Sequence, residues 1–103
     1  MPDLEHLRRI NQAANYVLTM HSRRRMNERG ILLRDVIRVI ETGEIIEQYP
    51  DDYPFPSCLV LGKTAAGRSL HAVVSAEDGH IYLITAYAPS GDEWEADGKT
   101  RRR

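Results

Sequence analysis

The segment His21–Ile31, with the sequence HSRRRMNERGI, holds the residues best suited to chemistry on a phosphodiester. Residues three and four apart are neighbours on a helix surface. At that spacing, adjoining faces of a helix would present His21, Arg24, Arg25, Glu28 and Arg29. Arginine offers a planar donor fork for phosphate, and histidine transfers protons near neutral pH. The alternative interpretation is a solvated basic helix face in which Glu28 forms salt bridges with its arginines.

Further candidate residues lie in the second half of the chain. His71 interrupts the apolar stretch LHAVV, where a lone histidine is more often structural than catalytic. Tyr87 ends the run IYLITAY, and its hydroxyl could donate to a phosphate or its ring could pack against the sheet. Lys99 and Arg101 lie near the C-terminus, where they could close over a site or form a frayed basic end.

Other kinds of chemistry find little support in the sequence. The histidines at positions 6, 21, 71 and 80 are scattered, and no Cys/His pair has the spacing of metal ligands. Neither a P-loop, nor a dinucleotide fingerprint, nor a nucleophile elbow is present. Cys58 is the only cysteine, and its apolar setting CLVL predicts a buried side chain. We therefore expect acid–base chemistry without a metal or cofactor, or no chemistry at all.

Length and composition predict one domain spanning residues 1–103, with 42% hydrophobic and 28% charged residues. No apolar run approaches the roughly 20 residues of a membrane helix. The polar N-terminus shows no signal peptide, so the cytoplasm is the expected compartment. The formal net charge is −1, yet eight arginines lie between Arg8 and Arg38, against Glu28 and Asp35. This asymmetry predicts a basic face on a nearly neutral protein.

Periodicity predicts helices first and strands second. The expected helices span residues 3–14, 20–29 and 33–42, and Thr19 is the expected cap of the second. Gly30 and Gly43 are expected to end the second and third helices, which would form a helical hairpin. The expected strands span 44–49, 57–63, 68–76 and 80–87, while 16–20 could be a strand or a turn. A polar tail, 88–103, follows and is expected to be anchored by Trp94. We therefore predict an α+β fold with two or three N-terminal helices on a four-stranded, mainly antiparallel twisted sheet.

Several segments together resemble a bacterial toxin family formerly catalogued as a domain of unknown function. They are HSRRRMNERGI, DVIRVIETGEIIEQYPDDYPFPSCLVLG, RSLHAVVS and IYLITAYAP, followed by Trp94 and by KTR at 99–101. The resemblance runs from about Tyr16 to Arg101 and leaves residues 1–15 as an extra N-terminal helix, which could contact a partner. The family is similar to the RelE/MqsR-type toxins, within the barnase–EndoU–colicin–RelE group of ribonucleases.

The resemblance implies the toxin of a type II toxin–antitoxin system, a metal-independent endoribonuclease paired with an MqsA-like zinc-finger antitoxin. RNA would bind the concave face of the sheet, and a 2′-hydroxyl would attack the phosphate. The expected acid–base pair is His21 and His71, in either order, with Glu28 as an alternative base. Tyr87 would orient the phosphate or stack on a base. The expected phosphate ligands are Arg24, Arg25, Arg29, Lys99 and Arg101.

Two rival interpretations remain open on the sequence. One is a non-catalytic module of the same fold that binds RNA or protein through its basic face. The other is an interaction protein that uses the acidic segment Glu41–Asp52 and the tail as its interface.

Overall fold

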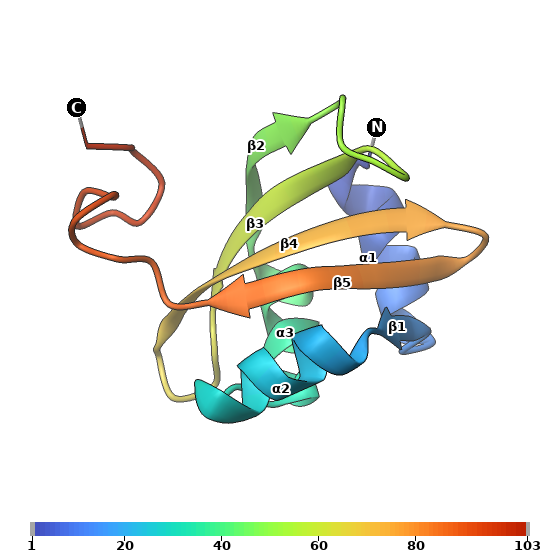
Figure 1. Ribbon diagram of the computed structural model, residues 1–103, viewed down its shortest axis with the longest axis horizontal. Helices are drawn as coiled ribbons and strands as arrows, with labels where there is room; N and C mark the ends of the chain where they lie inside the picture. Colours follow the sequence, from blue (N-terminus) through green and yellow to red (C-terminus); the bar gives the residue numbers. More distant parts are fainter. Residues whose placement is uncertain (1, 103) are drawn as a thin grey trace.

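The computed structural model describes residues 2–102 as three helices and one five-stranded sheet (Figure 1). The elements in chain order are α1 (Leu4–Gln12), β1 (Tyr16–Leu18), α2 (Met20–Glu28), α3 (Leu33–Thr42), β2 (Glu44–Tyr49), β3 (Ser57–Lys63), β4 (Ser69–Glu77) and β5 (His80–Tyr87). The strand order is β1-β5-β4-β3-β2. In Figure 1, α1 and α3 lie behind the sheet and α2 lies below β5. The α+β prediction is therefore confirmed.

The prediction of four strands is wrong, because residues 16–18 add a fifth. Tyr16–Leu18 pairs in parallel with β5, in the register Tyr16↔Ile81 to Leu18↔Leu83, whereas the other strand pairs are antiparallel. The sheet is therefore mixed. Three residues are too short a run for alternation to predict a strand, and this strand exists because β5 offers it a free edge.

Side-chain caps fix where the helices begin. Asp3 accepts a hydrogen bond from the backbone N–H of His6, and Thr19 accepts one from Ser22. Asp35 caps α3 from inside the helix by accepting from the backbone N–H of Leu32 at 2.9 Å. The first helix is shorter than predicted: it ends at Gln12, and Ala14 adopts a positive φ of 53° outside it.

The first and third helices form a pair. Arg8 of α1 donates to the carbonyls of Ile40 and Gly43 at 3.1 and 2.8 Å, which satisfies backbone acceptors at the end of α3. Asn11 donates to the carbonyl of Ile37. The predicted helical hairpin is wrong in its partners: α3 packs on α1 and β3, while α2 packs on β5. The extra N-terminal helix is thus part of the core.

The two faces of the sheet differ in what covers them. The face toward the helices carries the main core, with buried residues Cys58, Val60, Leu70, Ala72, Val74, Ile81, Leu83 and Ala86. Gly62 and Gly43 allow close approach there, since a Cβ on Gly43 would lie 2.3 Å from the Leu61 carbonyl oxygen. Among residues 2–102 no helix covers the opposite face, and the C-terminal segment curls beside one end of it (Figure 1). This second face, called the open face below, carries Glu47, His71 and Tyr87.

Two further expectations concern burial and membranes. Cys58 is buried, as predicted, and burial raises the pKa of its thiol to about 12, so it stays protonated at neutral pH. Among the residues that the structure describes, no helix is long and apolar enough to cross a bilayer.

Candidate active site at the open face of the sheet

His71 is an enclosed polar side chain on the open face. It is wholly buried, with a relative exposure of 0%. Its imidazole meets the indole of Trp94 edge-on, with ring centroids 4.6 Å apart, and the ring of Tyr87 at 5.2 Å. Its Nε2 lies 2.6 Å from the carbonyl oxygen of Gly98. Strand β4 supplies the imidazole, β5 covers it with Tyr87, and the C-terminal segment covers it with Trp94 and Gly98.

The hydrogen bond to Gly98 fixes which nitrogen of His71 carries the proton. A carbonyl oxygen only accepts, so Nε2 must be the donor and Nδ1 bears the lone pair. Within residues 2–102, Nδ1 is the one buried side-chain polar atom without a hydrogen-bond partner. Burial lowers the pKa of His71, opposed by the Gly98 hydrogen bond and the Glu47 charge. The imidazole is therefore neutral at pH 7, with a free basic nitrogen.

A carboxylate, a phenol and a guanidinium lie beside this histidine. Arg101 donates to both carboxylate oxygens of Glu47, at 2.8 and 3.0 Å, and its guanidinium sits 4.4 Å from the Trp94 ring centroid. Tyr49 donates to the same carboxylate at 2.6 Å. The Arg101 hydrogen bond lowers the pKa of Glu47, which keeps it ionised. Burial and the Glu47 charge raise the pKa of Tyr49 to about 12.

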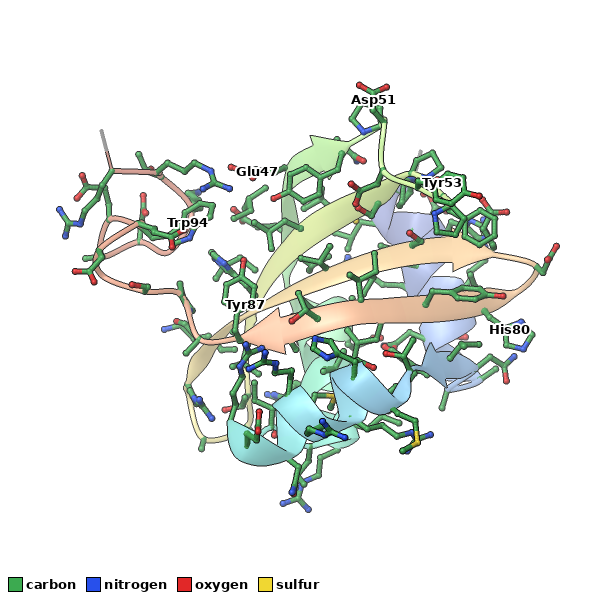
Figure 2. All side chains as sticks on the ribbon, viewed as in Figure 1. Glu47, Asp51, Tyr53, His80, Tyr87 and Trp94 are labelled. Atoms are coloured by element: carbon green, nitrogen blue, oxygen red, sulfur yellow. The ribbon has the colours of Figure 1, made fainter. Side chains whose placement is uncertain are left out.

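Tyr87 and Arg29 approach the site from the other side. His71 and Tyr87 are paired residues of β4 and β5. Burial raises the pKa of Tyr87, so its hydroxyl remains a donor. Arg29, at the end of α2, donates to the Ala86 carbonyl at 2.8 Å and to the Thr85 hydroxyl at 3.3 Å. Figure 2 shows Glu47, Tyr87 and Trp94 gathered at one end of the sheet, with Tyr53 and His80 at the other.

The remaining predicted residues of α2 face solvent. The exposed side chains are His21, Arg24, Arg25 and Glu28. Arg25 and Glu28 form an ion pair at 3.7 Å, with both side chains about half exposed. His21 lies in the first turn and Arg29 at the end of α2, about 12 Å apart along the axis at 1.5 Å per residue. The structure thus brings Arg29, and not His21, towards His71.

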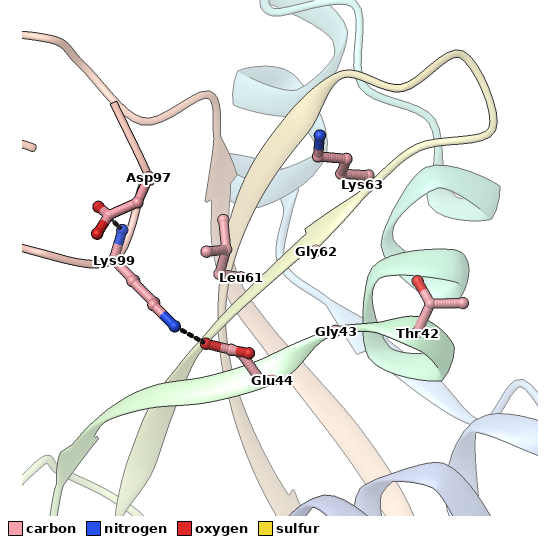
Figure 3. A pocket seen from close by; sticks show the side chains of 8 residues that line it. All are labelled: Thr42, Gly43, Glu44, Leu61, Gly62, Lys63, Asp97 and Lys99. Atoms are coloured by element: carbon pink, nitrogen blue, oxygen red, sulfur yellow. Dashed lines mark hydrogen bonds and ion pairs between the residues drawn. The ribbon is translucent and has the colours of Figure 1, made fainter. Parts of the chain in front are cut away.

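The predicted tail residues Lys99 and Arg101 are both engaged by strand β2. Lys99 pairs with Glu44 at 3.3 Å, at the mouth of a cleft of about 410 Å³ that also has Lys63 and Asp97 in its wall (Figure 3). Trp94 is 3% exposed and anchors the tail, as predicted. Both cations are therefore used to hold the tail in this conformation.

Sequence reasoning missed Glu47 and Tyr49. Alternation along EIIEQY places residues 47 and 49 on one face, and that signal was available. A register shift between Ile45 and Glu47 moves Ile46 out of the alternation. Because of this bulge, the sequence does not predict that Glu47 lies near His71. No cluster of three or more His, Cys, Asp or Glu side chains that could hold a metal occurs in the described part of the chain.

The arrangement defines a helix-on-sheet α+β protein with an imidazole, a carboxylate and two phenols on the sheet face away from its helices. Residues 18–88 match a family described as a domain of unknown function, DUF4258, and the chain belongs to this family. No curated protein and no solved structure shows significant similarity to this chain. The match includes α2, α3 and β2–β5 and ends one residue after Tyr87.

Proposed function

We propose that this chain is a metal-independent endoribonuclease whose chemistry is centred on His71. One observation carries the proposal: a neutral imidazole with a free nitrogen lies among Glu47, Tyr87 and Arg101 on the open face. Metal-free cleavage of RNA needs a base for the 2′-hydroxyl, an acid for the leaving oxygen and donors for the phosphate. The cluster offers a group of each kind.

In the proposed reaction, His71 Nδ1 accepts the proton of the 2′-hydroxyl while the 2′-oxygen bonds to phosphorus. The bond from phosphorus to the 5′-oxygen breaks, and the Tyr87 hydroxyl gives the leaving oxygen its proton. The products are a 2′,3′-cyclic phosphate and a 5′-hydroxyl end. Glu47 favours the imidazolium that forms, since its negative charge raises the pKa of His71.

Arg29 is the proposed phosphate ligand at the reacting centre, because its guanidinium is held beside Thr85 on the open face. Arg24 and Arg25 are the proposed contacts for the RNA backbone further along the strand. Their exposure on α2 supports that role. His21 and Glu28 have no part in the proposed chemistry, since they face solvent on α2.

We further propose that the protein is the toxin of a type II toxin–antitoxin system with a RelE/MqsR-like fold, acting in the cytoplasm and neutralised by an MqsA-like zinc-finger antitoxin. The sequence resemblance and the helix-on-sheet architecture support this assignment. Induced expression in a bacterial host should arrest growth and fragment RNA, and co-expression of an adjacent zinc-finger gene should restore growth. Normal growth with intact RNA at confirmed expression would contradict the toxin assignment.

The reaction itself is tested with purified protein and an end-labelled RNA. Cleavage in the presence of EDTA, with 2′,3′-cyclic phosphate ends, is the expected result. A matched oligonucleotide with a 2′-deoxyribose at the cleaved position should stay intact, because it has no attacking hydroxyl. Cleavage of that oligonucleotide at the same position would rule out the proposed mechanism.

A second candidate function is a non-catalytic RNA-binding module. The complete burial of His71 and its bond to Gly98 favour this candidate, because a structural histidine has such surroundings. This candidate would be supported if the protein bound RNA without cleaving it. Substitution of the α2 arginines should then abolish binding, and substitution of His71 should leave it unchanged.

A further inference from the structure

Part of the cover of His71 comes from a segment outside the family match. Trp94 and Gly98 contact the imidazole directly, and both follow residue 88, where the match ends. With His71 at 0% exposure, no phosphodiester can reach its free Nδ1 in this conformation. The group with the clearest catalytic character is therefore closed off by the chain's own C-terminal segment, residues 90–102.

This segment is held together by its own hydrogen bonds. Asp97 accepts hydrogen bonds from the backbone N–H groups of Lys99 and Thr100 and from the Thr100 hydroxyl. Trp94 and Arg101 form an isolated antiparallel β-bridge through their backbones. Within residues 90–102, only Trp94 and Gly98 are buried. The segment is thus a folded loop that rests on the sheet at few points.

Two side-chain links hold the loop to strand β2. Arg101 binds Glu47 through both carboxylate oxygens, and Lys99 binds Glu44 at 3.3 Å (Figure 3). The Lys99–Glu44 pair has both side chains more than half exposed, so it contributes little. The Arg101–Glu47 pair is bidentate and the Glu47 side chain is only 24% exposed, so it is the stronger of the two links. The unpaired, buried Nδ1 of His71 disfavours the closed arrangement, since water would satisfy it on opening. Opening of the segment would therefore exchange these two links and the burial of Trp94 for hydration of the unpaired Nδ1.

We propose that residues 90–102 form an autoinhibitory cap that opens and closes as a unit over His71 and Glu47. The cap occupies the hydrogen-bonding position at His71 Nε2 and neutralises Glu47 with Arg101. A ligand of the open site must displace both contacts. That this ligand is RNA rests on the proposed function, whereas the opening itself does not.

The test follows the reactivity of His71 towards diethylpyrocarbonate in the full-length protein, residue by residue, by mass spectrometry. In wild type, His71 should react far more slowly than the exposed His21 and His80. Arg101→Ala removes the ion pair and the cation–π contact, and should raise the His71 rate about tenfold. Arg102→Ala is the matched control, because the Arg102 side chain contacts Gly91 and Glu95, which both belong to the cap, and its loss should leave the rate unchanged.

Each outcome decides between the two proposals. The cap proposal is overturned if His71 reacts as fast as His21 in wild type. It is also overturned if the His71 modification rate is unchanged in the double variant Arg101→Ala, Lys99→Ala. Faster modification together with faster RNA cleavage in Arg101→Ala supports both proposals. Faster modification without cleavage by any variant supports the cap and overturns the endoribonuclease. Faster modification with slower cleavage overturns autoinhibition and assigns Arg101 to phosphate binding.

Discussion

Helix α2 and the His71 end of the open face carry the same kinds of side chain in opposite surroundings. On α2, His21, Arg24 and Arg25 point into solvent, and the Arg25–Glu28 pair is half exposed. On the sheet, His71 is buried and Glu47 is held by two partners. Chemistry depends on shifted proton affinities and fixed geometry, and these come from burial and partners. Under the proposed function, α2 would therefore contact the RNA and the sheet would carry the catalysis.

Arg29 belongs to α2 by sequence but to the sheet by contact, so it offers the sharpest test of this division. Arg29→Ala should lower the cleavage rate about 10²- to 10³-fold, the loss typical of one oriented donor at a developing charge. Arg25→Ala, the matched change on the exposed face, should lower it only a few-fold. Single-turnover cleavage at saturating protein separates the two. Equal losses of cleavage rate in Arg29→Ala and Arg25→Ala would contradict the proposed division of roles between α2 and the sheet.

The exposed arginines should act on binding alone. Arg24→Ala and Arg25→Ala should each weaken RNA affinity a few-fold for all sequences alike. Each should also reduce the slope of log affinity against log salt by about one, because one phosphate contact is lost. Fluorescence anisotropy over a salt series measures both quantities. An unchanged slope would mean that α2 does not contact the backbone.

Acid should loosen the cap. The pKa of His71 is lowered in the closed state, so the open state binds more protons and docking strengthens with rising pH. Docking is fully favoured above the ordinary histidine pKa of about 6.5 and weakens below it. Glu47, whose pKa is also lowered, adds the same trend at lower pH, while the other facing groups, Tyr49, Tyr87 and Arg101, keep their protons.

Trp94 is the only tryptophan, so its emission reports this opening directly. Between pH 7 and 5 the emission should shift to the red and become more accessible to iodide. His71→Phe, which keeps the ring and removes the titration, should flatten this change. A wild-type profile that is level from pH 7 to 5 would show that His71 does not control the cap.

The sequence predicted the elements better than their assembly. Thr19 and Gly30 placed the ends of α2 correctly, because a side-chain cap and a glycine with positive φ act locally. Gly43 also ends α3 as predicted, but with a φ of −90°, and its missing Cβ serves the close approach of the Leu61 carbonyl. Strand β1 and the pairing of α3 with α1 were missed, since both depend on distant partners.

The same limit applies to the site. The sequence singled out His71, Tyr87 and Arg29 one by one, and their convergence is a product of strand pairing and of the α2–β5 contact. The pairing of His71 with His21 followed from residue type alone, and the structure does not bring them together. Glu47 was missed because its nearness to His71 depends on the register of β2 against β3, which the bulge between Ile45 and Glu47 shifts.

The most direct test of the central claim compares His71→Gln with His21→Gln in metal-free RNA cleavage. A glutamine at 71 can still donate to the Gly98 carbonyl but offers no basic nitrogen, so the fold and the cap are preserved. The cleavage rate of His71→Gln should fall about 10²- to 10⁴-fold, the usual contribution of an acid–base group, while His21→Gln stays near wild type. Wild-type cleavage by His71→Gln, with Trp94 emission unchanged, would contradict the account.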